Sequence, residues 1–159
     1  MKRRFFCFTT PAFAGVFVCV LLALGLAGCA TPQVSSLVQH WPNDMPALSE
    51  IKEVPFFAQE EYECGPAALA MVLQTAGVPV LPEQLVEQVY LPGRKGSLQI
   101  ELLAASRRNG LPAYLLQPKL EALLREVAAG NPVLVLQNLS LAFYPVWHYA
   151  VVIGFDRER

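Results

Sequence analysis

The stretch AQEEYECGPAALAMVLQTAG, residues 58–77, places an isolated cysteine at the start of an apolar helical pattern. Apolar side chains recur at the helical interval at Leu69, Val72, Leu73 and Ala76. This spacing predicts a helix with one buried face. Gly77 is placed to end that helix, because glycine adopts a left-handed backbone at little cost. Cys64 therefore lies at the helix N-terminus.

The first 28 residues have the order of a secretory signal: three basic residues, a long apolar run, then small residues. The sequence LAGC, residues 26–29, resembles the lipobox of bacterial lipoproteins. That resemblance implies removal of residues 1–28 and a lipid on Cys29. Ala30, in place of an aspartate, implies sorting to the periplasmic face of the outer membrane. The alternative is an uncleaved membrane anchor, since the apolar run is nearly long enough to span a bilayer.

Cysteine usage follows from this processing. Of the four cysteines, Cys7 and Cys19 leave with the signal and Cys29 becomes a thioether. Cys64 is then the one thiol of the mature chain, so no intramolecular disulfide is possible. A single thiol in an oxidising compartment is either buried and inert or kept for chemistry.

The charge balance narrows the classes of partner. After removal of the signal, nine basic residues face 13 acidic ones, a net charge of −4. Because no run of Lys and Arg follows the signal, a nucleic-acid partner is not expected. A metal site is not expected, because Cys64 and the one histidine of the expected domain, His148, cannot build one without further carboxylate ligands. No cofactor is expected.

Residues 29–50 contain three prolines and few periodic apolar positions, which predicts a tether between lipid and domain. The alternative is a folded arm that docks on the domain through Leu37, Val38 and Trp41. Residues 51–159 form the expected domain, which we expect to be incomplete at its C-terminus because the sequence stops just past a central strand.

Within the domain, helical patterns come first and strands run to the end. Helices are predicted over 64–77, 82–89, 97–110 and 119–130, with Ser97 as a possible N-cap. Extended segments are predicted over 51–57, 113–117, 132–138 and 148–156, the last two as adjacent central strands. This order predicts an α+β fold in which a helical layer packs on an antiparallel sheet.

The position of Cys64 favours nucleophilic chemistry. A helix N-terminus offers partial positive charge and unpaired N–H groups, which lower the pKa of a thiol. Pro66 sits in the first turn, where a missing N–H is tolerated. Upstream carboxylates act in the opposite direction: Glu60, Glu61 and Glu63. A cationic partner is therefore needed, and histidine is the usual one.

The chain has two histidines. His40 lies in the expected tether, so His148, at the start of the last strand, is the domain histidine that can pair with Cys64. The competing interpretation is a buried inert thiol at Cys64 and a core histidine at position 148.

Three motifs are similar to those of the C39 peptidase family: VPFFAQEEYECGPAALAMVLQTAG, PVLVLQN and HYAVVIG. The resemblance covers residues 53–156 and implies a papain-like fold without a cofactor. It implies that Cys64 attacks a carbonyl carbon and that His148 moves the proton. It further implies that Gln59 and the Cys64 N–H line the oxyanion hole. The stand-alone, envelope-anchored members of the family are the most similar.

One feature departs from that family, whose third catalytic residue is an aspartate beyond the histidine strand. The mature chain has two aspartates, Asp44 in the expected tether and Asp156 at the end of the last strand. Either the chain is truncated, or His148 lacks its usual partner, or Asp156 or a backbone carbonyl replaces it. Because an unoriented histidine samples the wrong tautomer, we expect reduced or absent activity.

The sequence therefore supports an envelope-anchored cysteine peptidase that hydrolyses peptide bonds. A non-catalytic lipoprotein that binds a peptide or partner in the same groove is the alternative. Acyl or γ-glutamyl transfer is a third possibility, because an amine can resolve a thioester in place of water.

Overall fold

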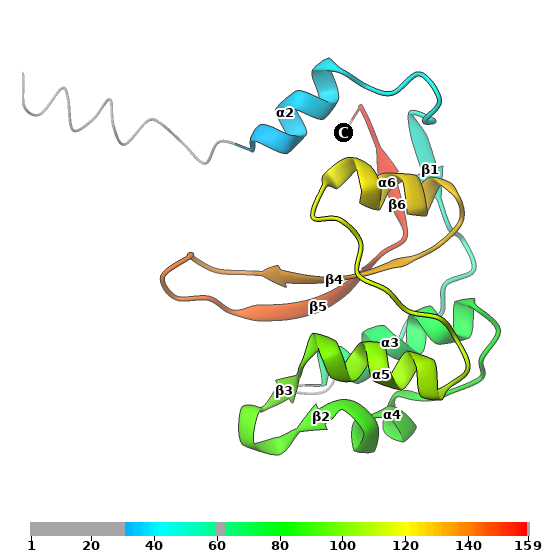
Figure 1. Ribbon diagram of the computed structural model, residues 1–159, viewed down its shortest axis with the longest axis vertical. Coiled ribbons are helices and arrows are strands. Elements are labelled where there is room, and N and C mark those ends of the chain that lie inside the picture. Colours follow the sequence, from blue (N-terminus) through cyan, green and yellow to red (C-terminus); the bar gives the residue numbers. More distant parts are fainter. Residues whose placement is uncertain (1–30, 60–62, 159) are drawn as a thin grey trace, which may run out of the picture.

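The computed structural model describes residues 31–59 and 63–158 (Figure 1). In chain order its elements are α2 (Pro32–Gln39), β1 (Leu48–Glu50), α3 (Cys64–Thr75), α4 (Pro82–Val89), β2 (Tyr90–Leu91), the 3-10 turn η1 (Pro92–Arg94), β3 (Gly96–Ser97), α5 (Gln99–Arg108), α6 (Leu120–Ala128), β4 (Val133–Asn138), β5 (Trp147–Val152) and β6 (Gly154–Asp156). The fold is mixed α+β, with small antiparallel strand pairs. The predicted signal segment with Cys7 and Cys19, and Cys29, the predicted lipidation site, lie outside the described residues.

The four helices predicted for the domain are present as α3, α4, α5 and α6. Gly77, Gly110 and Gly130 follow three of them with φ of 85°, 84° and 88°. These left-handed conformations stop a helix at low cost because glycine has no Cβ. Ser97 is not a helix cap: it belongs to β3, and Leu98 precedes the first residue of α5.

The main core lies where α3, α4 and α5 meet the β4–β5 hairpin. Leu73 of α3 and Leu85 of α4 are fully buried, and Tyr149 is the buried residue that β5 contributes. Half-buried side chains of the hairpin complete this cluster: Leu134, Leu136 and Val151. In Figure 1 the hairpin runs between α6 on one side and the α3–α5 layer on the other.

The two predicted central strands are adjacent and antiparallel. β4 and β5 pair from Val133 opposite Val152 to Asn138 opposite Trp147. The predicted strand 148–156 is divided at Ile153, because β5 pairs with β4 whereas β6 pairs with β1. The change of partner explains why one apolar run forms two strands.

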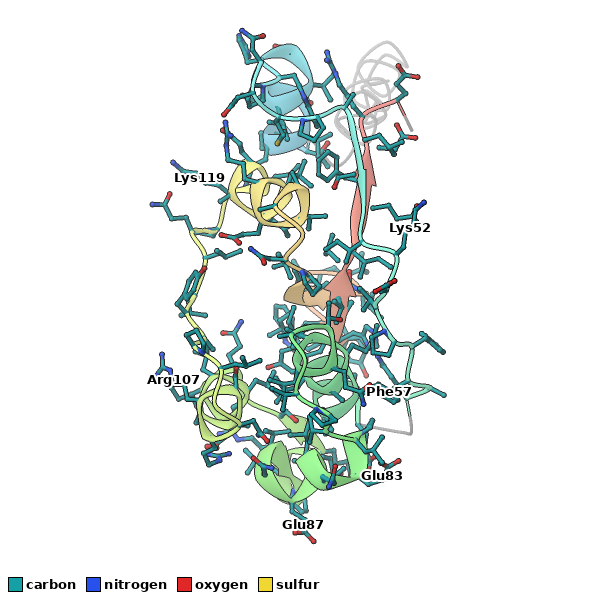
Figure 2. The ribbon with its side chains drawn as sticks, turned by 90° about the vertical axis from the view of Figure 1, so that its right-hand side faces the viewer. Lys52, Phe57, Glu83, Glu87, Arg107 and Lys119 are labelled. Atoms are coloured by element: carbon teal, nitrogen blue, oxygen red, sulfur yellow. The ribbon has the colours of Figure 1, made fainter. Side chains whose placement is uncertain are left out.

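The prediction of a strand over residues 113–117 is wrong. The segment has no regular secondary structure and links α5 to α6 along the side of the molecule, between Arg107 and Lys119 in Figure 2. Within the described residues no strand pairs with it, and its carbonyl at Ala113 accepts a hydrogen bond from Arg107 Nη2 at 2.7 Å. A β-rich pattern without a ladder partner does not form a strand.

Residues 31–50 differ from the predicted tether. They form α2 and β1, and Leu37 and Met45 are buried against Leu124 of α6. The ring of Trp41 lies 6.0 Å from that of Phe155, and its Nε1 donates to the Met45 carbonyl at 3.0 Å. The folded arm, the alternative interpretation, therefore describes this segment better than a tether, with Leu37 and Trp41 docked as expected and Val38 exposed instead.

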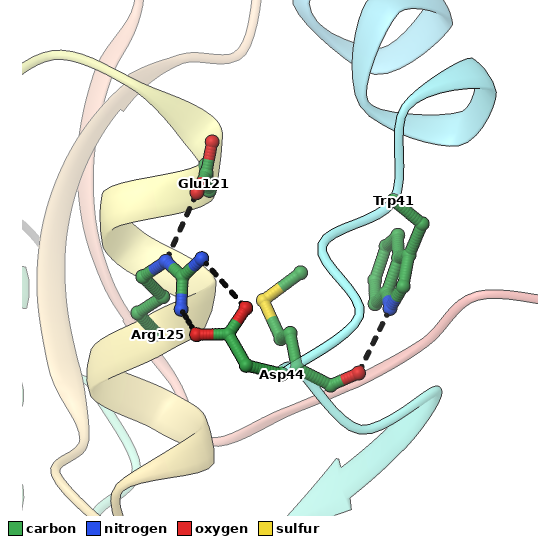
Figure 3. Close-up of polar contacts among 5 residues, drawn as sticks. Trp41, Asp44, Glu121 and Arg125 are labelled. Carbon is green, nitrogen blue, oxygen red and sulfur yellow. Dashed lines mark hydrogen bonds and ion pairs between the residues drawn. The ribbon is translucent and has the colours of Figure 1, made fainter.

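An exposed ion pair also joins the arm to α6 (Figure 3). The Arg125 guanidinium donates to both carboxylate oxygens of Asp44, at 2.8 and 3.1 Å, and to Glu121 at 2.9 Å. The hydrogen bonds from Arg125 lower the pKa of Asp44 below its usual value. Across the described ranges, no helix is long and apolar enough to cross a membrane.

Candidate active site

Cys64 is the first residue of α3 and is half-buried. Its thiol is free, and its side chain packs against the main core. Glu63 precedes the helix without a side-chain cap, so no capping side chain covers the first turn. The structure thus places Cys64 at a helix N-terminus, as the sequence pattern predicted.

His148 is the second residue of β5 and is half-buried, opposite the exposed Gln137 of β4. Side chains alternate between the two faces of a strand. Because Tyr149 faces the α3 side, His148 lies on the opposite face of the hairpin. No hydrogen bond or ion pair joins Cys64 and His148, although the structure describes both residues.

Gln59 is exposed and is the last described residue before residues 60–62, which lie outside the described ranges. The proposed oxyanion pair of Gln59 and the Cys64 N–H is therefore separated by an undescribed stretch. The role of Gln59 and the Cys64 N–H as an oxyanion hole stays a prediction.

Asp156 does not orient His148 in this structure. It pairs with Leu48 of β1, and its Oδ1 accepts from the Glu158 N–H at 2.9 Å. From His148 to Ile153 alone, an extended chain spans about 16 Å. Since β6 pairs with β1 and does not fold back on β5, the carboxylate lies well beyond hydrogen-bonding distance of the imidazole.

Near Cys64, Tyr149 and Ser97 make contacts that the sequence did not predict. The Tyr149 side chain is 3% exposed and donates its hydroxyl hydrogen to the Ser97 carbonyl at 3.2 Å. Burial, and then the charge of Cys64, raise the pKa of Tyr149 above its usual value. Ser97 packs directly on Gly65, the residue after the thiol. Two features of the sequence could have pointed to these contacts: the glycine that follows Cys64 and the tyrosine that follows His148.

A cavity of about 970 Å³ opens elsewhere, between α5, residues 112–120 and β4. Its walls are largely apolar and include Leu69, Leu102 and Leu136. None of the three candidate catalytic residues lines it. Among residues 31–59 and 63–158, no group of three potential metal ligands occurs.

The molecule is thus an α+β protein with a single described thiol at the start of a core helix, next to a hairpin that carries a histidine. The chain belongs to the Peptidase_C39 like family, whose model matches residues 51–159. This confirms the resemblance at the level of the family. No curated protein and no solved structure matches the chain.

Proposed function

We propose that the chain is a cysteine peptidase that uses Cys64 as its nucleophile. Membership of a C39-like peptidase family supports this activity, and the family implies a papain-like fold. The observation that carries the proposal is the half-buried Cys64 thiol at the first position of α3. A helix N-terminus is one of the environments in which proteins stabilise a thiolate.

The proposed reaction proceeds through an acyl-enzyme. Cys64 Sγ forms a bond to the carbonyl carbon of a peptide, and His148 takes the thiol proton. His148 then delivers that proton to the leaving amine as the C–N bond breaks and a thioester remains. Water hydrolyses the thioester and restores the thiol. The amide of Gln59 and the Cys64 N–H hold the negative oxygen of the tetrahedral intermediate.

This mechanism requires His148 to reach Cys64 before substrate binds. In the structure His148 lies on the hairpin face opposite Tyr149, so the proposal requires the start of β5, which follows the exposed residues 139–146, to change its conformation in solution. Catalytic hydrogen bonds are often long or misaligned in structures of free enzymes.

We propose in addition that the protein is a lipoprotein of the bacterial envelope. The LAGC sequence at residues 26–29 supports a lipid on Cys29. The anchor would place the domain at the periplasmic face of the outer membrane. Peptides of the envelope are then the substrates that it meets.

The test is hydrolysis of a mixed peptide library by the full chain, read by mass spectrometry, with Cys64→Ala as the decisive variant. Thr75→Ala, on the same helix, is the matched control, since its hydroxyl donates to the Met71 carbonyl within the helix. We expect cleavage by the parent and the control, and none by Cys64→Ala. Cleavage that survives Cys64→Ala would contradict the proposal.

The lack of a Cys64–His148 contact favours a second candidate, a non-catalytic protein that binds peptide at the same place. This alternative predicts that peptides bind equally to the parent and to Cys64→Ala and that neither protein cleaves them. Acyl transfer is distinguished in the same assay by adding a small amine, which would then appear in the product.

A further inference from the structure

One hydrogen bond joins the α3-facing side of β5 to Ser97 of β3, and Ser97 packs on the start of the cysteine helix. Tyr149 is buried in the main core, where Cys64 also packs. Its hydroxyl donates to the carbonyl of Ser97 in β3, 52 residues away in sequence, at 3.2 Å. This bond ties the short β2–β3 hairpin to the strand that carries His148.

Ser97 in turn presses on the first turn of α3. A Cβ added to Gly65 would lie 2.7 Å from the Ser97 Cβ, and would meet the Ser97 Oγ more closely still. Real Cβ atoms do not approach so closely, so position 65 must lack a side chain. The Ser97 Oγ is itself buried without a hydrogen-bond partner among the described residues. Tight packing rather than hydrogen bonding therefore accounts for its place against Gly65.

We propose that Tyr149 is a positioning residue for Cys64: through its bond to Ser97 it holds Ser97 against Gly65 and fixes the first turn of α3. The inference rests on the proposed role of Cys64 as a nucleophile. Tyr149 and His148 are neighbours on β5. The same hydrogen bond therefore also fixes the start of α3 relative to the strand that supplies the proposed base. Reactive groups held by packing keep their geometry without substrate.

Tyr149→Phe tests this role because it keeps the ring and removes only the hydroxyl. The measurement is the rate of iodoacetamide alkylation of Cys64 in the full chain, across pH values of about 5 to 9. We expect the rate near neutral pH to fall by about tenfold or more, as a misplaced nucleophile loses alignment with the helix N-terminus.

The matched control is Tyr144→Phe, which removes a phenol hydroxyl from a side chain that is 73% exposed. Its alkylation profile should match the parent. A merely structural role for Tyr149 would lower the unfolding temperature and leave the alkylation profile of the folded protein unchanged. That result would overturn the proposal.

A second pair of variants tests the contact between Ser97 and Gly65. This pair also tests the proposal if Tyr149→Phe fails to fold. Gly65→Ala should slow alkylation in the same way, because its methyl group displaces Ser97. Adding Ser97→Gly removes both clashing atoms and should restore the rate. A double variant as slow as Gly65→Ala alone would contradict the proposed contact.

Alkylation reports the thiol and not peptide cleavage, so the two proposals fail separately. Absence of hydrolysis with a shifted Tyr149→Phe profile would refute the peptidase and keep the positioning role. If Tyr149→Phe hydrolyses peptides and is alkylated at the same rates as the parent, only the positioning role is refuted.

Discussion

The residues that follow Cys64 determine which backbone donors face the thiol. Gly65 has no side chain because Ser97 occupies that space. Pro66 is fully buried and has no N–H, and the Ala67 N–H donates to the Glu63 carbonyl at 3.2 Å. The first-turn donors left for a developing charge are therefore the N–H groups of Cys64 and Gly65. The local sequence thus suits an oxyanion at this point.

Gln59→Ala tests the other half of the proposed oxyanion hole. Loss of one such donor costs about 3 kcal/mol of transition-state stabilisation, or on the order of a hundredfold in kcat. Steady-state hydrolysis of a cleaved peptide is the measurement. Gln39→Ala, an exposed glutamine of α2, is the control and should match the parent. Equal kcat for the two variants would remove Gln59 from the site.

Of the residues of the candidate site, some positions could be predicted from the sequence and others could not. Cys64 was predictable as a helix-start thiol from the pattern around it. The face occupied by His148 was not, because a shift of one residue in the pairing with β4 reverses every side chain of β5. The role of Tyr149 depends on a contact with Ser97, which no local pattern encodes.

Among the elements, helices were predictable because their signals are local. Apolar periodicity set α3 to α6, and glycines with positive φ ended three of them. Strands depend on distant partners. Residues 113–117 have a β-rich composition but no partner, whereas residues 48–50, within the predicted tether, became β1 because β6 offers an edge.

Leu73→Ala tests how far α3 depends on its buried face. Leu73 is fully buried between α4 and the hairpin, so the variant should lower the free energy of unfolding by about 2–5 kcal/mol. Urea unfolding measures the change. Val38→Ala, at a side chain that is 49% exposed, should change it by less than about 0.5 kcal/mol. A small effect at Leu73 would mean that the core lies elsewhere.

On the scale of the whole molecule, the N-terminal arm is part of the domain. Its second core cluster joins Leu37 and Met45 to α6, and β1 extends the fold by pairing with β6. Arg157 lies over the Trp41 ring at 5.3 Å from its centroid. The arm therefore packs on α6 and on β6. In Figure 1, α6 lies on the side of the β4–β5 hairpin opposite α3.

The Asp44–Arg125 pair makes the docking of the arm sensitive to acid. The pKa of Asp44 is lower in the folded chain, so the pair stabilises the fold above the unfolded value of about 3.9. That stabilisation is lost as the pH falls through the folded pKa. The parent should therefore unfold at higher urea than Asp44→Asn at neutral pH, and the difference should vanish in acid.

Glu87→Gln is the control for this comparison, because Glu87 is an exposed carboxylate on α4. Its urea midpoint should match that of the parent at neutral pH and in acid. Salt should weaken the Asp44 effect, since the pair is exposed. A pH-independent difference between parent and Asp44→Asn would show that charge does not dock the arm.

The most direct test of the account is the pH dependence of Cys64 alkylation in the full chain, followed on the Cys64 peptide by mass spectrometry. The parent is compared with His148→Ala, and His40→Ala serves as the control at the chain's other histidine. We predict reaction well below the usual thiol pKa of about 8.5, retained in His40→Ala and lost in His148→Ala. A thiol that titrates normally in all three, or reacts only after denaturation, would contradict the Cys64–His148 nucleophile.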